Sequence, residues 1–116
     1  MQIKQSPIHP LIPFLILGAA TLVVLVPLAL FGMPRSRDFY EHLHLARTYY
    51  YSILNGNVLP SWPGDVNGGF GDVSVRFYPP GLSLIWAFAR IIFGTWFRSA
   101  VAVFPILSFF GGVGTY

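Results

Sequence analysis

The chain has 116 residues, of which 54% are hydrophobic and only 9% are charged, and its mean hydropathy is +0.62. Soluble domains carry about 25% charged residues, so this composition excludes an ordinary water-exposed globule and indicates a membrane protein. The net charge of +3 comes from seven basic residues, too few for a nucleic-acid-binding surface. The absence of cysteine excludes disulfides, a thiol nucleophile and thiolate metal sites.

The first apolar segment covers residues 11–31 and contains no charged residue. About 20 such residues, folded as a helix, cross the ~30 Å hydrocarbon core of a bilayer. A cleaved signal peptide would be shorter and would be followed by a small-residue cleavage site, which this sequence lacks. We therefore predict a retained transmembrane helix, with Pro13 in its first turn and a kink at Pro27.

Residues 33–80 form a polar, aromatic loop that holds most of the charge. Within it we predict an amphipathic helix over residues 36–55, because apolar side chains recur there at intervals of three and four. These side chains are Phe39, Leu43, Ala46, Tyr50 and Ile53. Ser36 is a suitable N-cap and Asn55 with Gly56 a suitable stop. The remainder of the loop is rich in proline and glycine and predicts no regular element.

Two further apolar segments follow, at residues 81–97 and 99–116. Arg90 interrupts the first, and we expect its side chain to snorkel or to face protein. The second is apolar up to the last residue, so we expect the natural protein to continue beyond it. The predicted fold is an all-α membrane protein. Residues 1–116 form the N-terminal part of a polytopic domain with two to three transmembrane helices and an amphipathic helix in the first loop.

The most distinctive polar group in the loop comprises Asp38, Glu41 and His42. On a helix these residues lie at positions i, i+3 and i+4 and therefore share a face. Such a group could act as a general base or hold a divalent metal. The alternative is a solvated polar face at the membrane surface, where Asp38 only interacts with the helix dipole. His44 points away from this face.

The basic residues bear on the orientation of the loop. Four arginines lie in the loop, while Lys4, Arg98 and Arg90 are expected on the other side. The positive-inside rule therefore weakly favours a cytoplasmic loop.

A series of short motifs follows the first apolar segment. In chain order it comprises Arg37-Asp38, His42, Ala46, Leu54–Pro60, Trp62, Gly68–Gly71 and Phe77–Gly81. As a set, this series resembles the N-terminal portion of polytopic membrane glycosyltransferases of the GT-C type. It is most similar to the group called "6-pyruvoyl-tetrahydropterin synthase-related" membrane proteins, although nothing in the sequence indicates a pterin enzyme. The resemblance covers about residues 11–116.

The resemblance implies a multi-pass protein of the inner (plasma) membrane whose first loop is extracytoplasmic, against the indication from charge. In GT-C enzymes an acidic residue near the end of the first span assists sugar transfer from a polyprenyl-phosphate carrier, as a base or through a metal. Asp38 matches that position, and Glu41 and His42 are nearby candidates. The implied partners are membrane lipid and a lipid-linked sugar donor. The later loops of that family are missing here, so we expect the chain alone to be inactive.

Stabilising the carrier phosphate requires cations, and the loop offers Arg35, Arg37 and Arg76; this choice follows from charge and not from a family motif. The alternative function is a non-catalytic polytopic membrane protein, such as a transporter component or an assembly subunit, whose loop binds a partner. In the first case replacement of Asp38 abolishes transfer. In the second Asp38 tolerates replacement, whereas aromatic residues such as Trp62 do not.

Overall fold

The computed structural model describes residues 9–64 and 66–115, and all regular elements within these ranges are helical. The four α-helices are α1 (Ile12–Phe31), α2 (Arg37–Leu54), α3 (Pro80–Phe93) and α4 (Trp96–Thr115). Two short 3₁₀ helices, Asn67–Gly69 and Ser74–Arg76, interrupt the segment between α2 and α3. The predicted all-α fold is therefore confirmed for the described residues, and only these two short turns depart from the irregular loop that was expected.

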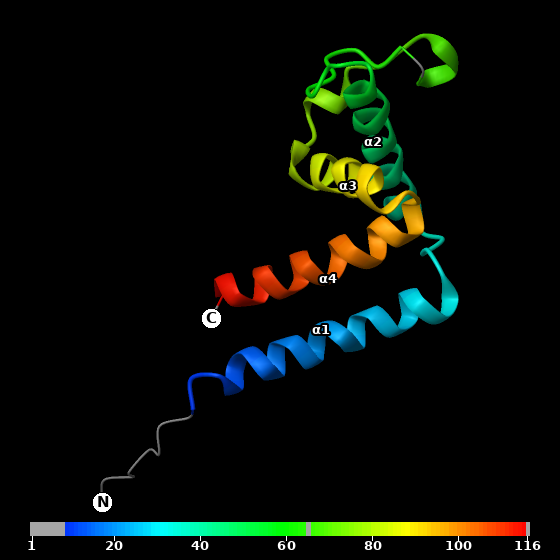
Figure 1. Ribbon diagram of the computed structural model, residues 1–116. Coiled ribbons are helices and arrows are strands. Elements are labelled where there is room, and N and C mark those ends of the chain that lie inside the picture. The colour runs from blue at the N-terminus through cyan, green and yellow to red at the C-terminus, as the bar shows by residue number, and fades with distance from the viewer. Residues whose placement is uncertain (1–8, 65, 116) are drawn as a thin grey trace, which may run out of the picture.

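The helices α1 and α4 have 20 residues each and are, among the described residues, the two that are long and apolar enough to cross a membrane by length and composition. They lie side by side and run in opposite directions (Figure 1). The packing is close where Gly112 of α4 faces Leu17 of α1, since a Cβ atom on Gly112 would lie 2.3 Å from Leu17 Cδ1. Most of the large apolar side chains of α1 are nevertheless exposed.

The helix α3 is shorter than the apolar segment 81–97 suggested. It ends at Phe93, because Gly94 adopts a left-handed conformation with φ of 76°, and α4 already begins at Trp96. A helix of 14 residues is about 21 Å long, well below the ~30 Å of a hydrocarbon core. The prediction of a span over 81–97 therefore corresponds to a helix too short to cross a membrane, and the next helix starts three residues before the predicted 99.

The three helices α2, α3 and α4 pack together around Trp86, which is fully buried. Its indole Nε1 donates a hydrogen bond to Ser99 Oγ at 3.0 Å. The Trp86 ring lies 5.4 Å from that of Phe39 and 5.2 Å from that of Phe104, both in edge-to-face geometry. The other buried residues of this cluster are Leu43, Ala46, Ala89, Ala100 and Val103. The apolar face predicted for the loop helix is thus confirmed as the surface that packs against α3 and α4.

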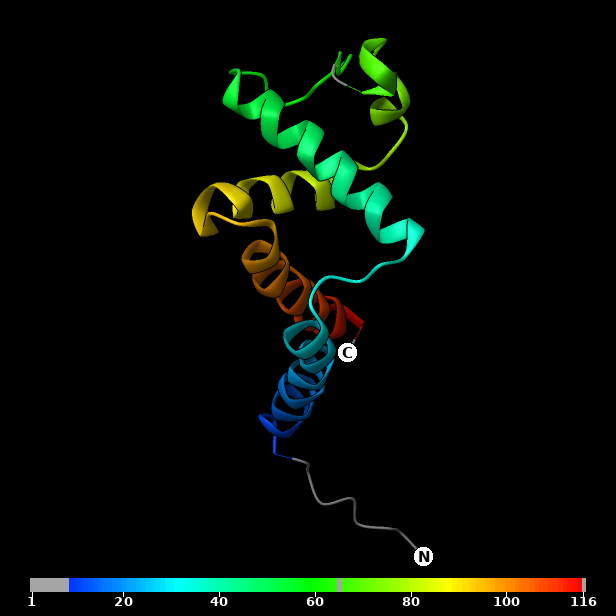
Figure 2. The same cartoon turned by 90° about the vertical axis from the view of Figure 1, so that its right-hand side faces the viewer.

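The described residues between α1 and α4 lie toward the end where α1 stops and α4 begins, with α3 beside the first half of α4 (Figures 1 and 2). We call residues 32–95 the head. The chain leaves α1 and enters α4 at the same end, because α3 does not run the length of α4. The six arginines therefore lie in the head or in the first turn of α4: Arg35, Arg37, Arg47, Arg76, Arg90 and Arg98.

Candidate functional site

The helix α2 carries the candidate site, and its start is defined by a local cap. Ser36 is extended, and its hydroxyl accepts a hydrogen bond from the backbone N–H of Phe39 at 3.3 Å. The helix ends at Leu54 with Asn55 as its C-cap. Both boundaries agree with the prediction. With its apolar face packed against α3 and α4, α2 turns its polar side toward the loop that follows it.

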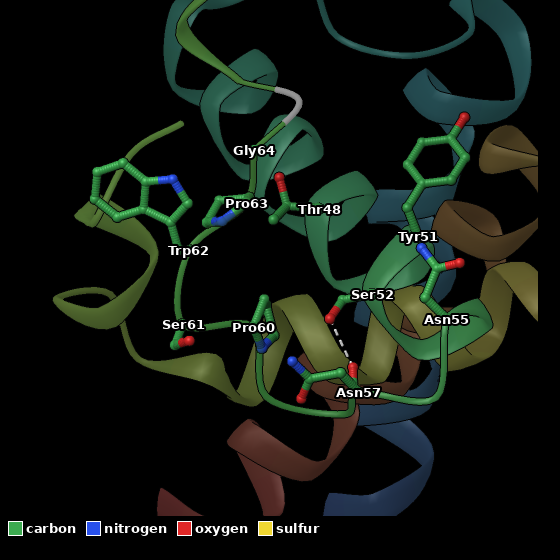
Figure 3. A pocket seen from close by; sticks show the side chains of 10 residues that line it. All are labelled: Thr48, Tyr51, Ser52, Asn55, Asn57, Pro60, Ser61, Trp62, Pro63 and Gly64. Carbon is green, nitrogen blue, oxygen red and sulfur yellow. Dashed lines mark hydrogen bonds between the residues drawn. The ribbon is translucent and has the colours of Figure 1, made fainter. Parts of the chain in front are cut away.

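The first pocket lies between the C-terminal half of α2 and residues 57–64 (Figure 3). We call it the Trp62 pocket; its cavity volume is about 610 Å³. It is lined by Thr48, Tyr51, Ser52, Asn55, Asn57, Pro60, Ser61, Trp62, Pro63 and Gly64. None of these side chains is ionisable in the physiological range, and most carry a hydroxyl, an amide or an aromatic ring. This composition suits a neutral, hydroxyl-rich ligand, which needs hydrogen-bonding groups of both kinds and an aromatic surface.

The loop beside this pocket is fastened at two points. Ser52 Oγ donates a hydrogen bond to the carbonyl oxygen of Asn57 at 2.7 Å, as drawn in Figure 3. Further along, Gly71 packs directly against Trp62: a Cβ atom at Gly71 would lie 2.2 Å from Trp62 Nε1. Gly71 also has a φ of 76°, which favours glycine. The glycine-rich stretch therefore serves to position the Trp62 indole.

The second pocket adjoins the first, since Thr48 and Pro63 line both. We call it the Glu41 pocket; its cavity volume is about 380 Å³. Four of its lining side chains can ionise, namely Glu41, His44, Asp72 and Tyr78. Glu41 and His44 come from successive turns of α2, while Asp72 and Tyr78 come from the loop. The arrangement brings proton acceptors and donors to the edge of an uncharged pocket.

Asp72 is held as a carboxylate by Ser74. The Ser74 hydroxyl donates to Asp72 Oδ2 at 2.6 Å, and the backbone N–H of Ser74 donates to Oδ1 at 3.0 Å. These hydrogen bonds lower the pKa of Asp72 below its usual value, and nearby His44 lowers it slightly further. An ionised Asp72 is suited to orient a neighbouring group or to stabilise positive charge, and less suited to accept a proton itself.

The residues predicted from sequence are distributed unevenly. Asp38, Glu41 and His42 are all exposed on α2, in keeping with their shared face. Glu41 lines the pocket that bears its name, whereas Asp38 lies one helical turn earlier and neither Asp38 nor His42 lines either pocket. No group of three histidine, aspartate or glutamate side chains that could hold a metal occurs among the described residues. The divalent metal that the resemblance allowed stays a prediction.

The three arginines proposed for the carrier phosphate also separate. Arg35 lies on the rim of an apolar groove of about 600 Å³ between the head end of α1 and α4. Leu28, Phe31, Phe39 and Phe104 are among its lining residues. Arg37 and Arg76 are exposed, at the start of α2 and in the second 3₁₀ helix respectively, and neither lines this groove. Of the three, Arg35 alone combines a positive charge with an adjacent apolar cavity.

Two members of the site were not predicted. His44 was expected to point away from the functional face, and Asp72 lies in the proline- and glycine-rich part of the loop, for which no functional role was predicted. The interval of three between Glu41 and His44 was visible, but nothing in the spacing indicated that the loop would bring Asp72 to them. Comparison of the chain with protein-family models, curated proteins and solved structures finds no match.

Proposed function

We propose that this chain belongs to an integral membrane glycosyltransferase that takes its sugar from a polyprenyl-phosphate carrier, with α1 and α4 crossing the inner (plasma) membrane and the head on the extracytoplasmic side. The observation that carries the proposal is the contact between the uncharged Trp62 pocket and the ionisable Glu41 pocket. A transferase needs both: a surface of amides, hydroxyls and aromatic rings for the sugar, and a base beside it. The motif resemblance supports the same class of activity.

The proposed reaction forms a bond between an acceptor oxygen and the anomeric carbon of the sugar. The acceptor hydroxyl gives its proton to Glu41, with His44 as the neighbouring alternative base. The bond between the anomeric carbon and the carrier phosphate oxygen breaks, and its electron pair stays on the phosphate. That charge needs a cation. Arg76 follows Val75, which lines the Glu41 pocket, and is the candidate nearer the proposed base. Arg35 lies before α2, beside the groove of about 600 Å³ that would accept the first part of the carrier chain, and is the alternative together with Arg37.

The test uses the protein in its native length in membranes. The donors are undecaprenyl-phosphate-linked glucose and mannose, and the readout is release of undecaprenyl phosphate. Glu41→Gln keeps the side-chain volume and removes the base, so we expect a loss of about 10² to 10⁴-fold. Tyr40→Phe is the control: Tyr40 is exposed and lines a separate surface pocket beside Glu41 and His44, outside the Trp62 and Glu41 pockets. The variant therefore removes a hydroxyl next to the base and keeps the base itself. Asp38→Asn tests whether Asp38 or Glu41 is the base. The resemblance predicts a loss of transfer comparable to that of Glu41→Gln, whereas the position of Glu41 in the pocket predicts a smaller loss.

A second candidate function is a non-catalytic membrane protein whose head binds a partner. The distribution of arginines favours it. Six arginines lie at the head end, whereas only Lys4 precedes α1, so the positive-inside rule indicates a cytoplasmic head. The proposed transferase requires the head on the extracytoplasmic side. Exposed aromatic side chains such as Phe70 and Phe77 would then contact the partner.

Orientation separates the two functions. The chain has no cysteine, so a single Phe70→Cys variant reports the location of the head through a membrane-impermeant maleimide applied to intact cells. Labelling without permeabilisation supports the transferase. Labelling only after permeabilisation overturns it.

A further inference from the structure

The helix α3 has two unlike faces. Its inner face, toward α2 and α4, carries Trp86 and small residues such as Ala87 and Ala89. Its outer face carries Ile85, Phe88 and Ile92, all exposed, with Ile92 at 76%. These three residues are spaced by three and four and so form one apolar stripe. A helix whose large apolar side chains point outward requires an apolar surrounding.

The position of α3 relative to the long helices suggests what that surrounding is. Figure 1 shows α3 running back alongside the first half of α4, and Figure 2 shows it inclined to the two long helices. In the same way Leu82 and Trp86 of α3 pack in one cluster with Val103, Phe104 and Leu107 from the middle of α4. With only 14 residues α3 cannot cross a bilayer. If α1 and α4 span the membrane, α3 therefore enters one leaflet beside the first half of α4 and does not reach the other leaflet.

Cationic and aromatic side chains occur where α3 passes into α4. The Arg90 guanidinium lies 5.2 Å from the centre of the Tyr50 ring and 5.6 Å from that of Trp96, and it donates to the Gly94 carbonyl oxygen. Its Nε atom is buried and has no hydrogen-bond partner among the described residues. Arg98 is exposed in the first turn of α4. Tryptophan and arginine side chains concentrate at the level of lipid headgroups, where arginine meets phosphate.

We propose that α3 is a short helix inserted into one leaflet of the membrane, at the surface where α1 ends and α4 begins. The Ile85, Phe88 and Ile92 stripe enters the acyl-chain region of one leaflet, and Arg90 and Arg98 meet the phosphates of anionic phospholipids. The ligand is thus a bilayer surface rather than a second protein. This inference goes beyond the proposed enzyme activity and rests only on the membrane location within it.

Site-directed spin labelling tests the proposal directly, since the chain contains no native cysteine. Phe88→Cys carries the label on α3, Val23→Cys on the exposed side of α1, and Phe70→Cys on the exposed loop. The protein is reconstituted in vesicles of phosphatidylcholine and phosphatidylglycerol, and collisions with oxygen and with a water-soluble nickel chelate are measured. We expect the label at 88 to favour oxygen, at a shallower depth than that at 23, and the label at 70 to favour nickel.

Each other outcome has a definite meaning. A label at 88 as open to nickel as that at 70 places α3 in water and overturns the proposal. A label at 88 closed to both reagents shows that protein covers the stripe, which also overturns it. A label at 23 that favours nickel removes the membrane location itself, and with it the membrane-bound transferase, so the two failures are distinguishable.

The contribution of anionic lipid is tested by its removal. In pure phosphatidylcholine we expect the oxygen preference at 88 to fall at least twofold. Arg98→Gln removes a charge proposed to meet the headgroup phosphates, so it should abolish most of this lipid dependence. It should leave the start of α4 intact, because Arg98 is exposed and its hydrogen bond to Thr95 Oγ1 comes from the backbone N–H. Arg76→Gln, in the loop, is the control, and this variant should retain the dependence of the oxygen preference on anionic lipid. An oxygen preference that is equal in both lipids overturns the headgroup role of the arginines.

Discussion

Replacing Gly71 by alanine tests whether the glycine-rich loop positions the Trp62 indole. The new Cβ atom would lie 2.2 Å from Trp62 Nε1 and 2.6 Å from Cε2, whereas carbon atoms in contact stay about 3.5 to 4 Å apart. The indole must therefore move by more than an ångström. Gly69→Ala is the matched control, because Gly69 also has a positive φ of 92° but no atom within 4 Å of its Cβ position.

The two substitutions share one cost and differ in the other. A non-glycine residue in the left-handed region costs about 1 to 3 kcal/mol, and this strain applies at both positions. The displacement of Trp62 applies only at Gly71. Because the indole is exposed and can move into solvent, its displacement changes the shape of the Trp62 pocket more than the stability of the fold. We expect Gly71→Ala to weaken binding in the Trp62 pocket at least tenfold relative to Gly69→Ala, corresponding to about 1.4 kcal/mol.

The assay follows the indole N–H resonance of Trp62 during titration with methyl α-D-glucopyranoside, assigned by its loss in Trp62→Phe. Far-UV circular dichroism checks that both variants remain folded. Equal affinities in Gly69→Ala and Gly71→Ala would refute the argument, because the contact with Trp62 would then have no influence on the pocket. Unchanged affinity in Trp62→Phe itself, measured by calorimetry, would remove the aromatic ring from the binding surface.

Three further predictions concern the packing and the charge of the fold. Gly112→Ala should destabilise the fold by about 1 to 3 kcal/mol relative to Gly111→Ala, because a Cβ atom at Gly112 meets Leu17 while one at Gly111 meets nothing within 4 Å. Unfolding in mixed micelles measures the difference in the free energy of unfolding. Equal stabilities would contradict the α1–α4 contact. Trp86→Phe removes the hydrogen bond to the Ser99 hydroxyl and should cost about 1 to 3 kcal/mol, measured in the same way. The hydrogen bonds from Ser74 lower the pKa of Asp72, so its carboxylate stabilises the fold above its unfolded pKa of about 3.9. That contribution is lost as the pH falls through the lower pKa that Asp72 has in the folded protein. Asp72→Asn should therefore make the free energy of unfolding fall less steeply at acid pH. An unchanged pH dependence would show that Asp72 does not contribute.

The helix α2 could be predicted almost to the residue because its signals are local. A serine cap, an acidic first turn, an apolar period of three and four and an Asn-Gly stop all agree there, and agreement of such signals specifies a single local structure. The short length of α3 was harder to anticipate. Hydropathy treats residues 81–97 as one apolar run, whereas Gly94 ends the helix by its backbone conformation, a property that average hydropathy does not register.

The site was only partly predictable for a different reason. The spacing on α2 correctly grouped Asp38, Glu41 and His42 on one helix, but a pocket needs a second wall. That wall is the loop carrying Asp72, whose position depends on tertiary contacts such as the burial of Val75 against Leu45 and Tyr49. Short-range periodicity contains no information about such contacts, so the involvement of His44 and Asp72 emerged only from the fold.

The reduced length of α3 also changes the argument about orientation. In the three-span interpretation Arg90 and Arg98 lay on the opposite side from the loop arginines, and the charge difference between the two sides was small. With α3 in the head, both arginines join the loop side, and most of the six lie within about 20 residues of an end of α1 or α4, where the positive-inside rule has most influence. The arginines can therefore be topological anchors on the cytoplasmic side or phosphate ligands on the other. A phosphate ligand should affect carrier binding one residue at a time, with Arg76 or Arg35 dominant, whereas topological anchors act by their total number. Replacing Arg37 and Arg76 together should consequently shift the orientation measured by labelling at residue 70 only if the arginines are anchors, and should leave it unchanged if Arg76 or Arg35 holds the carrier phosphate.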